Sequence, residues 1–163
     1  MKPILSLFLL ALAARAQTPP GPAAPAPATG GQTIITSDTL DLNLNKAKGA
    51  KQGLFRGNVK VDEPRFTMSS KEMTVFFAED DSVQDVEARE DVVIKRKDES
   101  SETDSEKAVY NVKDKKLTLL KVMRQPKVNT KDGKIVIADK IILFPEEDKM
   151  LTEGASRVML QKP

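Results

Sequence analysis

The segment Phe55–Val61 (FRGNVKV) decides the fold, because weaker copies of it recur along the chain. The copies are Ala88–Ile94 (AREDVVI), Arg124–Val128 (RQPKV) and Ser156–Leu160 (SRVML). Their last residues stand at positions 61, 94, 128 and 160, which gives intervals of 33, 34 and 32 residues. A nearly constant period of this length is typical of a chain built from similar structural units.

A second set of segments repeats with the same period. Each begins with a small residue, continues with two mostly polar positions and ends in an apolar alternation. The segments are Ser37–Leu44 (SDTLDLNL), Ser70–Phe77 (SKEMTVFF), Ser105–Val112 (SEKAVYNV) and Ala138–Pro145 (ADKIILFP), and their starts are 33, 35 and 33 residues apart. Two landmarks with one period predict a domain of about four repeats of roughly 33 residues.

Within each repeat, apolar residues alternate with polar ones. Leu40, Leu42 and Leu44 alternate with Asp41 and Asn43, and short charged or Gly- and Pro-containing segments separate the alternating runs. A period of two residues predicts β-strands, and no stretch has the period of an amphipathic helix. We therefore expect an all-β fold in which each repeat supplies roughly three short strands and buries one face by stacking on its neighbours.

The composition excludes several classes of function. Among 163 residues there is no His and no Cys, which excludes Ser-His-Asp and Cys-His catalysis, zinc sites of the usual kind and disulfides. Lys and Arg number 26 and Asp and Glu 24, and without Lys2 and Arg15 the counts become equal (26 − 2 = 24). A nearly neutral chain argues against nucleic acid as a partner. No cofactor and no metal site is predicted.

The first 31 residues are expected to lie outside the folded domain. Residues 1–16 have the features of a secretory signal peptide: Lys2, the apolar run Ile4–Ala14 and the small residues of Ala14-Arg15-Ala16 before the cleavage point. Residues 17–31 are rich in Pro, Ala and Gly and are typical of an extended tether. The domain is then predicted over residues 32–163, in the periplasm or another exported location.

Phe55–Val61 resembles the F-x-G-N-V-x-V element of the LptA/OstA family of periplasmic lipopolysaccharide-transport proteins. The segments Ile35–Leu40, Ser105–Val112 and Lys134–Leu143 resemble other parts of that family's repeats, so the resemblance runs from Thr33 to Leu160. It implies an elongated, twisted, open β-jelly roll, V-shaped in section, with an apolar groove along its length. It also implies a carrier, not an enzyme, that shields the acyl chains of lipopolysaccharide and bridges the inner and outer membranes during outer-membrane assembly.

The expected lipid-binding residues are the apolar positions of the alternating segments, whose side chains would all point to the inner face of the sheet. Tyr110 is the strongest candidate, because its ring can line a groove while its hydroxyl reaches water. The full set is Ile35, Leu40, Leu42, Phe55, Val59, Val61, Met73, Val75, Phe77, Tyr110, Val112 and Leu143.

The two ends of the domain are expected to be edge strands. Ile34–Thr36 and Val158–Leu160 would offer unpaired backbone to a neighbour by strand addition. The resemblance implies head-to-tail self-association and docking to inner- and outer-membrane transport proteins at these edges. In the third repeat Pro126 replaces a ladder donor, which predicts an edge or a bulge there.

Three alternatives to a soluble carrier stay open. One is an LptC-like partner of the same pathway, associated with the inner membrane through a retained N-terminal helix. Another is a structural β-repeat module whose inward faces fill a core and bind no ligand. The last is a carboxylate-pair hydrolase, although no Asp or Glu lies in the apolar setting that would shift its pKa.

Overall fold

The computed structural model describes residues 33–160 with the exception of 46 and 48. The predicted signal peptide and tether lie outside the described residues. In the described part the regular elements are all strands, and no helix there is long and apolar enough to cross a membrane. They are β1 (Ile34–Thr36), β2 (Thr39–Asn43), β3 (Gln52–Asp62), β4 (Phe66–Phe77), β5 (Val83–Arg96), β6 (Ser101–Asn111), β7 (Lys116–Leu120), β8 (Lys127–Thr130), β9 (Ile135–Phe144) and β10 (Lys149–Met159).

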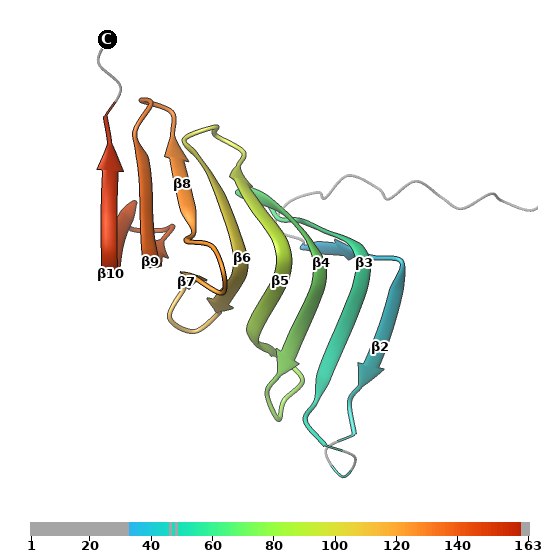
Figure 1. Ribbon diagram of the computed structural model, residues 1–163. Coiled ribbons are helices and arrows are strands. Elements are labelled where there is room, and N and C mark those ends of the chain that lie inside the picture. Colours follow the sequence, from blue (N-terminus) through green and yellow to red (C-terminus); the bar gives the residue numbers. More distant parts are fainter. Residues whose placement is uncertain (1–32, 46, 48, 161–163) are drawn as a thin grey trace, which may run out of the picture.

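The strands form one antiparallel sheet that follows the chain from end to end. The order is β1-β3-β4-β5-β6-β7-β9-β10, with β2 on β3 beside β1 and with β8 between β6 and β9. Figure 1 shows this succession from blue to red, with neighbouring strands side by side along an elongated molecule. The predicted all-β fold of stacked repeats is confirmed, and β1 and β10 lie at the two ends of the order.

Three strands bend sharply in the middle. The ladders shift register between Arg56 and Val59 in β3, between Arg89 and Val92 in β5, and between Glu153 and Ser156 in β10. The shifted positions have left-handed backbone, with φ of 75° at Gly57, 46° at Asn58, 61° at Glu90, 52° at Asp91 and 79° at Gly154. Left-handed residues at a bulge increase the local twist and bend the strand. The two halves of a strand therefore belong to two walls of the sheet.

In the third repeat a loop, and not a bent strand, connects the two walls. We call each place where the sheet turns from one wall to the other a corner. β7 ends at Leu120 and β8 begins at Lys127, while both pair with β9 on one side and β6 on the other. Pro126 is fully buried just before β8, inside the sheet. Of the two positions predicted for Pro126, an edge or a bulge, the edge is wrong. The proline instead lies where the ladder is interrupted, which is the other position a residue without an N–H can take in a sheet.

The two sequence landmarks meet at these corners. The charged residue after each small residue of the second set lies against the corner of the following strand. Asn58 Nδ2 donates to Asp38 Oδ2 at 2.9 Å, and the backbone N–H groups of Met123 and Arg124 each donate to Glu106 Oε2 at 2.7 Å. Lys71 Nζ lies 2.9 Å from Asp91 Oδ2, and Ala155 N donates to Asp139 Oδ2 at 2.9 Å. The four residues at positions 38, 71, 106 and 139 repeat with spacings of 33, 35 and 33.

The inward side chains are small at the corners, where the walls converge. Ser70, Ala88, Ser105, Ala108 and Ala138 lie there and are buried. Larger buried side chains flank the corners and complete the core, namely Val59, Met73, Val92, Leu119, Val128 and Ile141. The expectation of three short strands per repeat holds only in part. The strands β3, β4, β5, β6, β9 and β10 are long and continue through the corners, whereas the short strands β1 and β2, and likewise β7 and β8, are separated at a corner.

The corner in β3 requires glycine at position 57. A Cβ built on Gly57 would lie 2.3 Å from Asp38 Oδ2, and the backbone φ of 75° is one that residues with a side chain rarely adopt. We predict that Gly57→Ala lowers the free energy of unfolding by about 2 kcal/mol, measured by urea denaturation. The matched control is Glu90→Gly at the corresponding corner of β5, which should cost less than about 0.5 kcal/mol because glycine accepts its φ of 61°. Equal stability of Gly57→Ala and the unsubstituted protein would contradict this role for the corner.

Candidate functional site

An apolar cavity lies between the two walls of the bent sheet. Its volume is about 490 Å³, and both ends of β5 line it, Val86 on one wall and Ile94 with Arg96 on the other. This size is within the range of small-molecule pockets in proteins. Besides Val86 and Ile94, the apolar lining residues are Ile35, Val61, Phe66, Met68, Met73, Val75, Val83, Tyr110, Val112, Leu117, Leu143, Phe144, Pro145 and Met150.

The structure brings seven of the twelve predicted lipid-binding residues to this cavity. They are Ile35, Val61, Met73, Val75, Tyr110, Val112 and Leu143. Phe55 and Phe77 are partly buried and pack against the core, and Val59 is buried completely. Leu40 and Leu42 are 53% and 51% exposed on β2, on the side that holds Gly53 and Phe55, so they extend the inward apolar face beyond the cavity.

Sequence reasoning missed part of the lining. Val86 has the same inward parity as Ala88 in β5, and Met150 pairs with Leu143 across β9 and β10, so extending the alternation would have found both. The charged lining residues Arg65, Arg96 and Asp148 lie in or next to turns. No periodic pattern marks such positions, and they come together only in three dimensions.

Ion pairs connect the two walls across the mouth of the cavity. Arg65, in the turn between β3 and β4, donates from Nη1 to Glu146 Oε1 at 3.1 Å, although the two residues are 81 positions apart. Arg96, at the end of β5, donates from Nη1 to Asp148 Oδ1 at 2.9 Å. Lys115 Nζ donates to Glu146 Oε2 at 2.6 Å. The turn between β9 and β10 is thus tied to the opposite wall, and we call this set of five side chains the mouth cluster.

The mouth cluster sets the protonation of its members. The hydrogen bond from Lys115 is the main cause that lowers the pKa of Glu146, and Arg65 adds to it. The hydrogen bond with Glu146 raises the pKa of Arg65 above its ordinary value. Burial raises the pKa of the nearby Tyr110, although the positive charge of Arg65 acts in the opposite direction. The ion pair between Arg65 and Glu146 therefore favours the charged form of both side chains.

A buried hydroxyl faces the same cavity. Thr103 on β6 is 3% exposed and lines the cavity, and among the described residues its Oγ1 has no hydrogen-bond partner. Thr103 pairs with Ile94, two residues before Arg96. A polar atom thus lies unsatisfied in the apolar wall, on the strand that pairs with the end of β5.

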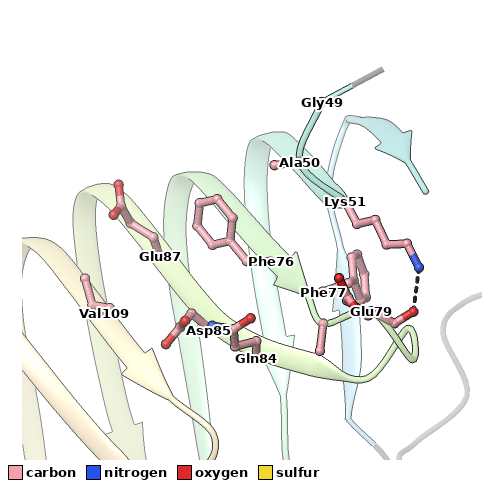
Figure 2. Close-up of a pocket in the computed structure, with 11 residues that line it drawn as sticks. Gly49, Ala50, Lys51, Phe76, Phe77, Glu79, Gln84, Asp85, Glu87 and Val109 are labelled. Atoms are coloured by element: carbon pink, nitrogen blue, oxygen red, sulfur yellow. Dashed lines mark hydrogen bonds between the residues drawn. The ribbon is translucent and has the colours of Figure 1, made fainter. Parts of the chain in front are cut away.

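A second hollow of about 580 Å³ lies on the other side of the sheet (Figure 2). Figure 2 shows Phe76 and Val109 beside the carboxylates of Asp85 and Glu87, with Lys51 bonded to the backbone oxygen of Glu79 at 2.8 Å. Burial would raise the pKa of Glu87, but Lys107 and Arg89 bind its carboxylate and the pKa is lowered. Charged groups inside this outer hollow make it a poor site for an alkyl chain, because an alkyl chain would desolvate them.

The described residues offer little for catalysis. No group of three or more Asp and Glu side chains in this part of the chain could hold a metal ion. The inner cavity is lined by one phenol, by charged side chains at its mouth, and by the hydroxyls of Thr33, Ser100, Ser101, Thr103 and Thr130. This arrangement can bind an apolar ligand and orient a polar end at the mouth.

Comparisons with known proteins agree with this geometry. The family model for LptA/(LptD N-terminal domain) LPS transport proteins matches residues 31–149. No curated protein sequence matches the chain. A similar solved structure is that of LptH from Pseudomonas aeruginosa, described as the LptA homologous periplasmic component of the conserved lipopolysaccharide transport device. It superimposes with a TM-score of 0.68 at 14% identity, covering 81% of this chain and 96% of that one. The shared fold is the β-jelly roll that the family resemblance implied, and it agrees with the all-β fold predicted from the repeats.

Tyr110 allows a direct test of the cavity, because the chain has one Tyr and no Trp. We predict that its phenol titrates above the ordinary pKa of 10.0, since burial disfavours the phenolate. Arg65→Gln should raise this pKa further and Glu146→Gln should lower it, because the first removes a stabilising cation and the second a repelling anion. Ultraviolet absorbance of the phenolate measures the midpoint. The protein unfolded in denaturant is the control and should titrate near 10, and the same midpoint in the folded state would contradict the prediction.

Proposed function

Since the chain belongs to the LptA/(LptD N-terminal domain) family of LPS transport proteins, we propose that it is a periplasmic carrier of lipopolysaccharide. Its groove would shield the acyl chains while the sugars stay in water, and the protein would bridge the inner and outer membranes. The observation that carries this proposal is the apolar cavity between the two walls of the sheet.

The physical task explains why an open apolar groove is suitable. Each CH₂ group of an acyl chain contributes about 0.8 kcal/mol when it leaves water, so several long chains cannot cross an aqueous compartment unshielded. A cavity of about 490 Å³ has the size of a pocket for one small ligand and covers part of such a bundle. The exposed Leu40 and Leu42 continue the apolar face beyond it. A groove that continues into a neighbouring molecule would shield the remainder.

The edge strands support the proposed partners. β1 and β10 end the strand order, and an unpaired strand edge adds a further strand readily. In β10 the apolar residues Leu151, Val158 and Met159 are exposed beside that edge. We expect head-to-tail association of copies, and docking to transport proteins of the inner and outer membranes, by addition of strands at these two edges.

The alternatives predict different results. An LptC-like partner at the inner membrane would retain its N-terminal apolar segment, so N-terminal sequencing of the exported protein separates it from a released carrier. A structural β-repeat module would purify without lipid. The cavity favours the carrier over the module, because a module needs no open volume between its walls.

We predict that lipopolysaccharide contacts the inner wall and not the outer one. Benzoylphenylalanine placed at position 110 should crosslink to lipopolysaccharide after ultraviolet irradiation, while the same group at position 109 should not. The two positions are neighbours on β6, but Tyr110 lines the inner cavity and Val109 lines the outer hollow. Mass spectrometry of the purified protein should also detect bound lipid. Equal crosslinking at both positions, or neither lipid nor crosslink with lipopolysaccharide added, would overturn the carrier in favour of the structural module.

A further inference from the structure

Each of the two arginines in the mouth cluster has one carboxylate partner on its own wall and another on the opposite wall. Arg96 donates from Nε and Nη2 to Asp98, two residues away on its own wall. Its Nη1 reaches the opposite wall, at Asp148 Oδ1 and, at 3.5 Å, at the backbone oxygen of Pro145. Arg65 has Glu63 on its own wall, with Nη2 and Oε1 3.6 Å apart, and reaches Glu146 across the mouth. Each arginine therefore stays anchored on its own wall when its partner across the mouth is lost, and donors become free.

The carboxylates across the mouth are weakly held. The side chain of Asp148 is 81% exposed, and that of Glu146 is partly exposed. Exposed ion pairs of this kind contribute between about 0 and 1 kcal/mol, because water solvates the separated charges well. Glu146 also keeps Lys115 as a partner. Little free energy therefore opposes an exchange of these carboxylates for another anion.

A phosphate group is the anion that best suits the vacated donors. It carries more charge than a carboxylate, and the planar guanidinium group binds it through two parallel hydrogen bonds. Both arginines line the apolar cavity, so an anion bound there would lie directly beside alkyl chains inside it. This juxtaposition is the arrangement of a phosphorylated lipid, with its chains buried and its headgroup at the water boundary.

The unsatisfied Thr103 hydroxyl points independently to a polar ligand atom. A buried hydroxyl without a partner costs about 1–3 kcal/mol, and Thr103 lines the cavity and pairs with Ile94, two residues before Arg96. A polar atom at the headgroup end of a ligand would satisfy it. The apolar part of the cavity supplies no such partner.

We propose that Arg65 and Arg96 form a binding site for the phosphate of a lipid headgroup, and that Glu146 and Asp148 occupy it in the free protein. The proposal rests on the carrier function above and deepens it. Lipid entry then exchanges two carboxylates for the ligand's phosphate and separates the two walls at the mouth.

The test compares two lipids that differ only in phosphate. Diphosphorylated lipid A and the same lipid with its phosphates removed are titrated into the full chain, with Tyr110 fluorescence as the readout. The unsubstituted protein should bind the phosphorylated form about tenfold more tightly. Arg65→Gln with Arg96→Gln should abolish this ratio. Glu146→Gln with Asp148→Asn should increase it several-fold, because the competing carboxylates are gone.

The opposite signs of the two double variants separate the proposal from a purely structural role. If the ion pairs only brace the walls, both double variants weaken binding of the phosphorylated lipid alike, and the proposal is overturned. The control, Arg56→Gln with Arg89→Gln, removes two exposed arginines that pair with Glu72 and Glu87 and should leave the ratio unchanged. A similar loss of the ratio in this control would also overturn the proposal, since net charge would explain the preference.

Two further outcomes locate any failure. Equal binding of both lipids by the unsubstituted protein overturns the phosphate site and leaves the carrier function standing, whereas binding of neither lipid overturns the carrier function itself. Inorganic phosphate alone is the last arm. If it displaces nothing at millimolar concentration, the lipid headgroup is the source of the anion, and if it binds as tightly as the lipid, the site is one for free phosphate and the headgroup assignment is overturned.

Discussion

The corner in the middle of each repeat is the constraint on which the rest of the structure depends. At Gly57-Asn58 the backbone takes two left-handed residues in succession, and the carboxylate of Asp38, between β1 and β2, accepts a hydrogen bond from the side-chain amide of Asn58. The same device recurs at Gly154, where Asp139 accepts from the next backbone N–H group, and hydrogen bonds from Gln125, Ala155 and Lys121 lower the pKa of that carboxyl to about 2. Because every repeat bends, one continuous sheet supplies two facing walls without closing into a barrel.

Side-chain size then determines where the space between the walls is filled. Ala88, Ala108 and Ala138 lie near the corners and are buried, so the walls meet closely there. Toward the strand ends the inward residues are larger and partly exposed, as at Tyr110 and Leu143. Tight packing at the corner and wider separation at the rim leave a wedge, and the cavity of about 490 Å³ occupies its wide part.

The sequence predicted the strands and their period because both depend on local alternation. It presented the two landmarks of each repeat as separate features, whereas in the structure Asp38 and Asn58 are two sides of one corner. The sequence did not reveal this relation, because the corresponding corner in β5 is formed by Glu90 and Asp91. Both take the left-handed conformation although neither is glycine, so no shared residue type marks the corners. The lining of the cavity could be predicted in part: alternation identified Tyr110 and Leu143, whereas Val59, which has the same parity, lies in the core and outside the lining. The mouth cluster could not be found in this way, since Arg65 and Glu146 are 81 residues apart and lie in turns.

The corners and the mouth differ in the kind of interaction that holds them, and this difference determines how the groove can open. The corners are flanked by backbone ladders and by large buried side chains such as Val59, Met73 and Leu119, each of which contributes about 1.5–3 kcal/mol, so their loss would unfold the sheet. The mouth is joined by exposed ion pairs between turns, and no strand pairing connects Arg65 or Arg96 to the turn at residues 145–148. A ligand that separates the walls at the mouth therefore breaks weak contacts while every β ladder stays intact. A bent open sheet with a polar rim can in this way admit a bulky apolar ligand and release it again, which a closed core of the same composition could not do.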